Sequence, residues 1–210
     1  MIMDSLITLL KKIPIDLGQQ TVADYTMGKQ IALELVPPGD GQRALDVGAR
    51  AGHQTRWLQS RGYHVTSIDV EPMFPECMQV DANQRLPFDD DSFDLVWCSE
   101  VIEHLNDPEF SLNDLRRITK PGGTLLLTTP NSYAWLFRFI ALFGFTPQRI
   151  QRKDHVQFFD FRDIQKLAPD AELFGYFPYL IIKRKITKGI GALSPTFVMR
   201  IVKGRTDPAP

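Results

Sequence analysis

The sequence predicts an α/β fold in which helices cover both faces of a doubly wound, mostly parallel sheet of seven strands. Three observations support this prediction. Short β-type apolar runs alternate along the chain with segments of helical periodicity, as in strands joined by crossover helices. The runs are too uniformly apolar to leave one face in water, which is typical of a sheet buried on both sides. Each run also ends at a turn signal or a polar residue, which marks the end of a strand.

The strands are expected in two groups. Five lie in the first two thirds of the chain and are predicted to be parallel. The last two segments are predicted to finish the sheet with antiparallel C-terminal pairing. The expected strands cover residues 43–49, 64–70, 78–80, 93–99, 124–129, 172–183 and 196–203.

Helices are expected before and between these strands. In the N-terminal region, two apolar series at helical spacing end at Pro37-Pro38-Gly39. Asp107 and Pro108 have the residue types of an N-cap and a first helical position. The expected helices cover much of residues 1–36 and residues 52–61, 109–119, 135–145 and 160–167.

The composition indicates one globular domain and excludes some functions. The chain has 210 residues, 43% of them hydrophobic, which is enough for one sizeable core. Lys and Arg total 24 against 25 for Asp and Glu, so no nucleic-acid partner is expected. The basic residues at 183–188 are expected to form a solvated edge. Cys77 and Cys98 have no metal-ligand spacing, so neither a disulfide framework nor a metal site is predicted.

No targeting or membrane-spanning segment is predicted. The apolar run at residues 1–13 lacks the charges before it and the cleavage site after it that mark a secretory signal. No apolar stretch reaches the roughly 20 residues that cross a bilayer. A cytoplasmic location is therefore expected. Peripheral membrane contact through this run and the aromatic segment at 135–145 is a second interpretation, although packing against the sheet explains both with fewer assumptions.

A glycine turn follows the first predicted strand. Gly48 and Gly52 lie where this strand ends and the next helix begins. Glycine at such a turn lets the backbone approach a ligand, because no Cβ stands in the way. Asp46, just before the turn, has the chemistry either to hold the turn or to meet the cationic end of an amino-acid moiety.

Acidic residues mark the ends of further predicted strands. Asp69 ends the strand after the glycine turn, about 20 residues on, where a doubly wound fold receives a ribose hydroxyl pair. Glu71 is an alternative, but Asp69 lies at the strand terminus itself. Asp81 and Glu100 follow two later strands. Ligands of open α/β sheets bind outside the carboxyl ends of the strands, so these acids are expected to line one crevice.

Several short motifs lie between residues 44 and 131. They are Leu86-Pro87-Phe88, Ser92-Phe93-Asp94-Leu95-Val96, Ser99-Glu100-Val101-Ile102-Glu103-His104, Arg117, Lys120-Pro121-Gly122-Gly123 and Thr128-Thr129-Pro130-Asn131. This block resembles the small-molecule class I S-adenosylmethionine-dependent methyltransferases. Within that family it is similar to the group that contains quinone-biosynthesis and sugar or lipid-precursor methyltransferases. A weaker similarity continues at His155-Val156-Gln157-Phe158-Phe159.

The resemblance implies a Rossmann-like fold that binds S-adenosyl-L-methionine and releases S-adenosyl-L-homocysteine. The glycine turn and Asp46 would line the methionine end, Asp69 would take the ribose hydroxyls, and Asp81 would lie by the adenine. Glu100 would form the floor where cofactor and acceptor meet, although a helix cap is an equal alternative for it. The implied cofactor-binding residues are Asp46, Gly48, Ala49, Gly52, Asp69, Val70, Asp81, Ala82, Ser99 and Glu100.

Two departures from the family pattern stand out. Arg50 occupies the position of a usual third glycine, which predicts a differently shaped loop or a lower affinity for the cofactor. The stretch between Asp69 and Asp81 is short and contains Pro72 and Pro75 in place of a full helix. One side of the adenine pocket is therefore expected to be more open.

Two histidines are the candidate catalytic residues. His104 lies in the loop after the fourth predicted strand, and His155 lies in the segment that the resemblance places near the acceptor. A histidine can accept a proton from an acceptor hydroxyl near neutral pH. A purely structural role is the alternative for each. An acceptor at carbon or nitrogen would need no base, and no metal is required for this transfer.

The predicted organisation is a single domain over residues 1–203. It comprises N-terminal helices at 1–36, the cofactor-binding core at 43–131, and an acceptor lid with C-terminal strands at 132–203, and a loose tail follows at 204–210. The aromatic residues of 135–145 hint at a hydrophobic acceptor.

Three functions are consistent with the sequence. The first is methyl transfer to a small molecule, most simply to a hydroxyl of a sugar, quinone-like or lipid-linked precursor. The second is a non-catalytic cofactor-binding or scaffold protein, which the departure at Arg50 keeps open. The third is a nicotinamide-dependent oxidoreductase, but Arg50 and Ala51 interrupt the full glycine fingerprint that it needs. Nothing in the sequence indicates the oligomeric state.

Overall fold

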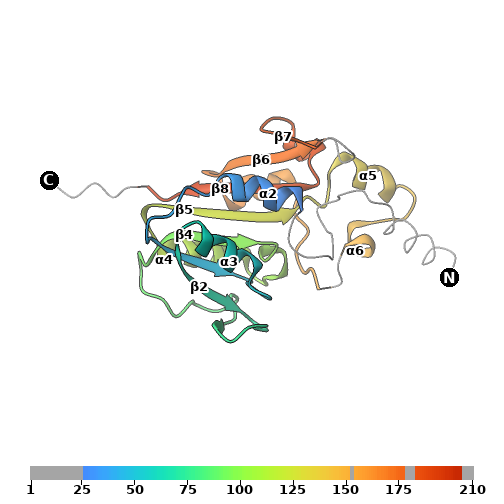
Figure 1. The fold of residues 1–210 in the computed structure, drawn as a ribbon. Coiled ribbons are helices and arrows are strands. Elements are labelled where there is room, and N and C mark those ends of the chain that lie inside the picture. Colours follow the sequence, from blue (N-terminus) through green and yellow to red (C-terminus); the bar gives the residue numbers. More distant parts are fainter. Residues whose placement is uncertain (1–25, 152–153, 178–182, 205–210) are drawn as a thin grey trace.

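The computed structural model describes residues 26–151, 154–177 and 183–204, which form one sheet flanked by helices (Figure 1). The strand order is β3-β2-β1-β4-β5-β8-β6-β7. β1 to β5 pair in parallel, whereas β8 is antiparallel to both β5 and β6, and β7 is antiparallel to β6. The strands are β1 (Arg43–Val47), β2 (His64–Asp69), β3 (Cys77–Gln79), β4 (Phe93–Ser99), β5 (Thr119–Pro130), β6 (Glu172–Phe177), β7 (Arg184–Ile186) and β8 (Thr196–Val202).

The predicted doubly wound, Rossmann-like α/β class with antiparallel C-terminal pairing is confirmed, with eight strands in the sheet instead of seven. The extra strand arises because residues 172–203 contribute three strands, β6, β7 and β8, where two were predicted. β5 also begins five residues earlier than expected. The backbone of Gly122 and Gly123 is held to Lys203 by two hydrogen bonds of 2.8 and 3.0 Å, which extends the strand.

Helices lie on both faces of the sheet. They are α2 (Met27–Glu34), α3 (His53–Ser60), α4 (Pro108–Ile118), α5 (Trp135–Ala141), α6 (Pro147–Ile150), α7 (Phe161–Leu167) and α8 (Ile190–Leu193), with a 3-10 turn, η1 (Ile102–His104). α4 begins at Pro108 as predicted, because the Asp107 side chain accepts a hydrogen bond from the Phe110 N–H. α7 begins at a capping box formed by Asp160 and Asp163. The predicted helix at 1–13 lies outside the described residues.

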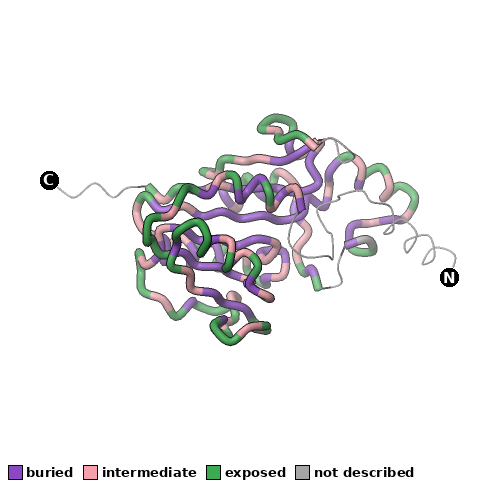
Figure 2. The backbone as a smooth tube through the Cα atoms, viewed as in Figure 1, coloured by how far each residue is buried: buried purple, intermediate pink, exposed green. Residues whose placement is uncertain are grey.

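The core has two halves, one on each face of the sheet. Along β4, Leu95 and Trp97 pack in the half that includes α2 and α3, whereas Val96 and Cys98 pack in the half that includes α4. The central strands are buried along most of their length, as Figure 2 shows. This two-sided burial explains why the strand sequences are apolar without alternation. Within the described residues, no helix is both long and apolar enough to span a bilayer.

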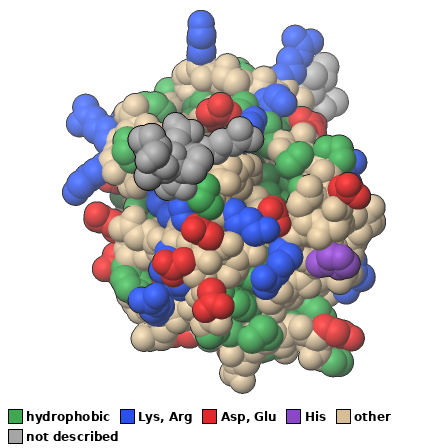
Figure 3. All heavy atoms as spheres, turned by 90° about the vertical axis from the view of Figure 1, so that its left-hand side faces the viewer, with side chains coloured by type: hydrophobic (Ala, Val, Ile, Leu, Met, Phe, Trp, Pro, Cys, Tyr) green, Lys and Arg blue, Asp and Glu red, His purple; other side chains and the backbone are tan. Residues whose placement is uncertain are grey.

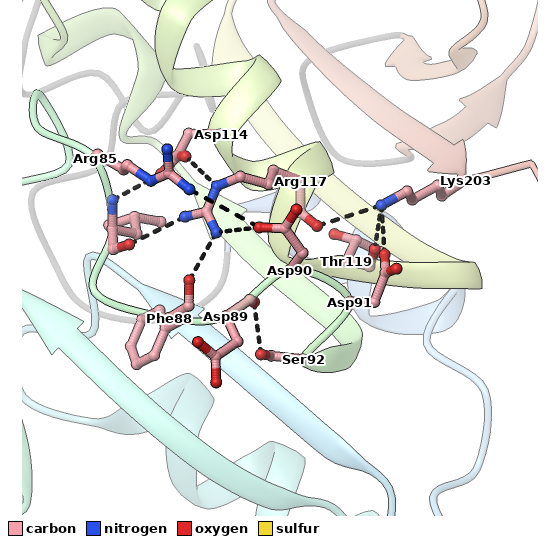
Figure 4. Close-up of polar contacts among 11 residues, drawn as sticks. Arg85, Phe88, Asp89, Asp90, Asp91, Ser92, Asp114, Arg117, Thr119 and Lys203 are labelled. Carbon is pink, nitrogen blue, oxygen red and sulfur yellow. Dashed lines mark hydrogen bonds and ion pairs between the residues drawn. The ribbon is translucent and has the colours of Figure 1, made fainter.

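The amino ends of β4 and β5 are fixed by polar contacts around Arg117 (Figure 4). Its guanidinium donates to the carbonyls of Leu86 and Phe88 at 3.0 and 2.7 Å and to the carboxylates of Asp114 and Asp90 at 2.7 and 2.8 Å. Two of the motifs that carry the family resemblance therefore have a structural role at this edge. Figure 3 views this end of the molecule, where acidic and basic side chains are interspersed.

Candidate functional site

The loop after β1 is a tight turn with three residues in the left-handed backbone region. Gly48 and Gly52 have φ angles of 77° and 74°, and Arg50 between them has a φ of 44°. A Cβ on Gly48 would lie 2.5 Å from Cγ2 of Val101, in the loop after β4. Glycine is therefore required where these two loops meet. Arg50 keeps the conformation that glycine adopts most easily, so this departure leaves the turn intact.

Asp69 is the last residue of β2, and its side chain holds the glycine turn in place through a hydrogen bond. Its side chain is buried, its Oδ2 accepts the backbone N–H of Arg50 at 2.9 Å, and its Oδ1 accepts that of Glu71 at 2.8 Å. Each carboxylate oxygen has two lone pairs, so both oxygens can accept one further hydrogen bond. Asp69 therefore orders the turn and can still receive a pair of hydroxyl groups.

Asp46 is buried between β1 and α3. Its Oδ2 accepts a 2.6 Å hydrogen bond from the Thr55 hydroxyl, which also lies 2.8 Å from the Ser67 hydroxyl. Burial raises the pKa of Asp46 to about 6, although the hydrogen bond from Thr55 opposes this change. The structure thus gives Asp46 a role in holding α3 and the turn to the sheet. Its contact with the amino-acid moiety of a ligand stays a prediction.

The other residues predicted to bind the cofactor, with Asp81 and Ala82 expected beside the adenine, lie after β1, β2 and β3. Ala49 is buried, Val70 is exposed, and Ala82 is half-buried against the core. Asp81 is exposed, and its Oδ1 accepts hydrogen bonds of 2.9 Å from both the backbone and the side-chain amide of Asn83. Asp81 therefore closes a local turn at this edge of the sheet.

The segment between β2 and β3 packs against the glycine turn. Residues 70–76 form no helix, as the two prolines predicted. The Met73 N–H donates to the Arg50 carbonyl at 3.3 Å. A Cβ on Gly52 would lie 2.8 Å from the ring of Phe74. The segment therefore supports the turn directly, with an aromatic ring lying against Gly52.

Ser99 and Glu100 lie where β4 ends. Glu100 has a φ of 58°, a second strained non-glycine residue at this edge of the sheet. The Thr128 hydroxyl donates to Glu100 Oε1 at 2.8 Å. Because a threonine hydroxyl has only one proton, the Ser99 hydroxyl donates to Thr128 over their 2.7 Å separation. The end of β5 thereby orients the Glu100 carboxylate.

His104 and His155 are brought together although they are far apart in the sequence. Their rings meet edge to face, with centroids 4.7 Å apart. His155 is buried and His104 is half-buried. The His104 Nδ1 lies 2.9 Å from the backbone carbonyl of Asp154 and 3.7 Å from its carboxylate. The two candidate catalytic residues thus form one histidine pair beside the loop after β4.

Glu103 joins the histidine pair. It is 1% exposed, and its backbone carbonyl accepts the N–H groups of Val156 and Gln157 at 3.0 and 2.9 Å, which holds the 154–159 segment in place. Its Oε2 accepts a 3.1 Å hydrogen bond from the Thr129 hydroxyl. Burial, and then the nearby Glu100 carboxylate, raise the pKa of Glu103 well above its usual range.

α5 and α6 lie beyond the carboxyl end of β5, on the same side as these loops (Figure 1). Phe137 of α5 is buried, but Trp135, Phe139, Leu142 and Phe143 are between 47 and 81% exposed. Packing against the sheet therefore accounts for only part of this aromatic segment.

Comparisons with known proteins agree with this geometry. Residues 45–127 match a family model described as a methyltransferase domain. A stretch of 98 residues is 33% identical to the malonyl-[acyl-carrier protein] O-methyltransferase of Erwinia billingiae and covers 42% of this chain and 39% of that protein. A second stretch, of 105 residues, is 30% identical to the ubiquinone biosynthesis O-methyltransferase of Aeromonas salmonicida. It covers 43% of this chain and 44% of that protein. The chain thus spans less than half the length of these curated relatives.

Residues 45–127 are therefore similar to the domain of the class I S-adenosylmethionine-dependent methyltransferases. Solved structures agree at the level of the fold. The putative methyltransferase bound to the Trm112 activator of Haloferax volcanii has a TM-score of 0.61 at 20% identity, covering 85% of this chain and 89% of that chain. The YcgJ protein of Bacillus subtilis has a TM-score of 0.60 at 17% identity, covering 86% and 100%.

The methyltransferase fold brings most of the predicted site residues to one edge of the sheet, but not all in the expected way. The glycine turn, Asp69, Ser99 and Glu100 lie at the ends of β1, β2 and β4, whereas Asp46 is turned into the core. Glu103 was not predicted as a site residue. The run Glu100-Val101-Ile102-Glu103-His104 contains a second acid next to the candidate histidine, and that spacing was the available signal.

Proposed function

We propose that this chain uses S-adenosyl-L-methionine to methylate a hydroxyl group of a small, hydrophobic acceptor. The observation that carries the proposal is the arrangement at the carboxyl edge of the sheet. There the glycine turn, which Asp69 holds, approaches Val101 in the loop after β4, and His104 in the same loop pairs with His155. A cofactor site and a proton-accepting site would then be adjacent, which supports the proposal.

The residues present fit the cofactor. The left-handed turn at Gly48 and Gly52 exposes backbone with no Cβ, and Asp69 keeps lone pairs for the two ribose hydroxyls. Exposed Val70 offers an apolar surface beside the adenine position. When bound, the cofactor supplies an electrophilic methyl group on a sulfonium.

The protein's part in such a transfer is to align the acceptor, to exclude water and to receive one proton. His104 is half-buried and its Nδ1–H can donate to the Asp154 carbonyl, which leaves the lone pair on Nε2 for the acceptor hydroxyl. Buried His155 packs against the ring of His104 and fixes its orientation. As the acceptor oxygen bonds to the methyl carbon, the bond from that carbon to the sulfonium sulfur would break and leave a neutral thioether, and the hydroxyl proton would pass to Nε2 of His104.

The acceptor class rests on the relatives and on α5. One relative is named for the O-methylation of malonyl-acyl carrier protein, one for ubiquinone biosynthesis and one, from Clavibacter sepedonicus, as a demethylmenaquinone methyltransferase. The exposed aromatic side chains of α5 beyond the site favour an apolar acceptor. Among the acceptors expected from the sequence, a quinone-like phenol or a lipid-linked precursor therefore fits better than a free sugar.

A methyl-transfer assay tests the proposal. The protein is incubated with S-adenosyl-L-methionine and, separately, a short-chain prenylated hydroquinone, a malonyl thioester and a free hexose, and product is identified by mass spectrometry. We expect methylation of the hydroquinone and a fall in kcat of about 100-fold or more for His104→Gln, with unchanged affinity for S-adenosylhomocysteine. Cofactor binding without methylation of any acceptor would favour the scaffold interpretation instead.

A further inference from the structure

Glu103, His104 and His155 form a cluster whose chemistry goes beyond proton transfer. One carboxylate oxygen of Glu103 and one ring nitrogen of each histidine all lie within 4.8 Å of one another. Glu103 and His104 come from η1, after β4, whereas His155 comes from the segment after α6. Two imidazoles and one carboxylate meeting at one point are a common ligand set for a transition metal.

The Glu103 carboxylate is incomplete without a further partner. Its Oε2 receives the Thr129 hydroxyl, but its Oε1 is buried and has no hydrogen-bond partner among the described residues. A buried carboxylate oxygen that is left unpaired costs free energy, so a partner is expected at this point. A cation held between Oε1 and the two histidines would supply that partner.

Each histidine has a hydrogen-bond partner at Nδ1, as metal-binding histidines usually do. The Nδ1 of His104 faces the Asp154 carbonyl at 2.9 Å, and the Nδ1 of His155 faces the Gln151 amide oxygen at 3.4 Å. Both oxygens can only accept, so Nδ1 is the donor in each ring and the lone pair is on Nε2. Metal-binding histidines are held in this way by a carbonyl or a carboxylate on the opposite nitrogen.

We propose that Glu103, His104 and His155 bind one divalent transition-metal ion such as Zn²⁺. Imidazole nitrogens favour such an ion over Mg²⁺ or Ca²⁺, which prefer oxygen ligands. Tetrahedral Zn²⁺ holds its ligand atoms about 3.4 Å apart, so the three side chains would draw together by about an ångström. Three protein ligands leave a fourth position open, on the side where His104 is half-buried.

The open position lies at the site where the acceptor is proposed to bind. If the proposed function is right, the ion would take over the role given above to His104: an acceptor hydroxyl on the ion would have its pKa lowered, and its proton would leave to solvent while both histidines stay ligands. That consequence rests on the proposed function. Metal binding itself rests on the cluster geometry, and its test requires no methyl transfer.

The experiment is a metal titration of the full chain after treatment with EDTA and desalting. Zn²⁺ is titrated by calorimetry, and Co²⁺ by its visible absorption, which reports nitrogen and oxygen ligands. We expect one ion per chain with a Kd of about 10 µM or lower. Glu103→Gln, His104→Gln and His155→Gln should each weaken binding at least tenfold. His64→Gln, at the exposed start of β2, is the matched control and should bind as the wild type does.

Binding of S-adenosylhomocysteine and thermal unfolding of each variant separate loss of the metal site from loss of the fold. Stoichiometric metal binding that is lost in folded variants of the cluster, but kept in His64→Gln, would establish the site. Two results would overturn it: no stoichiometric binding by wild-type protein that still binds S-adenosylhomocysteine, or equal binding by folded His104→Gln and His155→Gln proteins. Neither result would touch the proposed methyl transfer.

Discussion

Single backbone conformations decide the shape of the loop after β1. Arg50 and Glu100 both have positive φ angles, and they lie in the loops that follow β1 and β4. A non-glycine residue in this region costs about 1–2 kcal/mol, and such strain is concentrated at functional sites. The strain at Arg50 is sustained by hydrogen bonds from its N–H to Asp69 and from Met73 to its carbonyl.

Arg50→Gly and Gly48→Ala are therefore expected to have unequal effects on stability. Arg50→Gly relieves strain while adding chain entropy to the unfolded state, so stability should change by no more than about 1 kcal/mol. Affinity for S-adenosylhomocysteine should be kept or improved. Gly48→Ala adds a Cβ 2.5 Å from Val101 and should cost about 1–3 kcal/mol. Urea unfolding of both variants measures the difference; equal stabilities would refute this account of the turn.

Asp46 makes the stability of the protein depend on pH. Burial raises its pKa in the folded protein from the usual 3.8 to about 6, so the folded state binds this proton more tightly than the unfolded state does. The stabilisation is fully present below pH 4 and is lost as the pH rises through 6. It corresponds to at most about 3 kcal/mol.

Asp46→Asn should remove this dependence. The amide has no proton to lose, so the stability of the variant relative to the wild type should rise from pH 4 to pH 7, by up to about 3 kcal/mol. Urea unfolding at several pH values measures this difference. A difference that is constant across the range would show that Asp46 does not titrate with a raised pKa.

Among the elements, α4 and the segment before β4 are joined by Arg117. The guanidinium makes four hydrogen bonds to two carbonyls and two carboxylates, and it is only 17% exposed. A lysine at this position would keep the positive charge, but its single ammonium group cannot reproduce the planar set of N–H donors of the guanidinium.

Arg117→Lys should therefore lower the free energy of unfolding by about 1–3 kcal/mol, since it leaves part-buried carbonyls without donors. The neighbouring Arg116→Lys is the matched control. The Arg116 guanidinium is 27% exposed and pairs with the half-exposed Asp170, so Arg116→Lys should lower the free energy of unfolding by less than about 1 kcal/mol. Affinity for S-adenosylhomocysteine should be unchanged in both, because these contacts lie at the amino ends of the strands. Similar losses in the two variants would contradict the role given to Arg117.

For the whole molecule, the sequence predicted the central elements well and the connections poorly. β1, β2, β4 and α4 lie where their apolar patterns and caps placed them, because each buries a long, regular face. α6, α8 and η1 have three or four residues each, too few for any periodicity to appear.

The site was only partly predictable for a related reason. Glycines and acids at strand ends are recognisable because parallel strands end at one edge. The meeting of His104 with His155 depends on the bonding of residues 156 and 157 to the Glu103 carbonyl, a long-range contact with no local signature. The orientation of the Asp46 side chain toward the core likewise depends on its hydrogen bond from Thr55, which lies on α3.

The distribution of charged and aromatic side chains over the surface predicts which face of the molecule contacts lipid. The surface at the amino ends of the parallel strands carries mixed charges (Figure 3). At the opposite end of the molecule, α5 exposes aromatic side chains. We expect co-sedimentation with vesicles of anionic lipid at low salt and at least a twofold loss of bound protein for Phe139→Ser combined with Phe143→Ser. Affinity for S-adenosylhomocysteine should not change. Wild-type protein that stays wholly in the supernatant would refute peripheral membrane contact.

The central claim is that the carboxyl edge of the sheet binds the cofactor through Asp69. Calorimetric titration with S-adenosylhomocysteine tests it most directly, on the wild type, on Asp69→Asn and on the remote surface control Asp170→Asn. We predict one-to-one binding that weakens at least tenfold, or about 1.4 kcal/mol, in Asp69→Asn alone. A folded wild-type protein that binds no S-adenosylhomocysteine, or a folded Asp69→Asn variant that binds it equally well, would contradict the account.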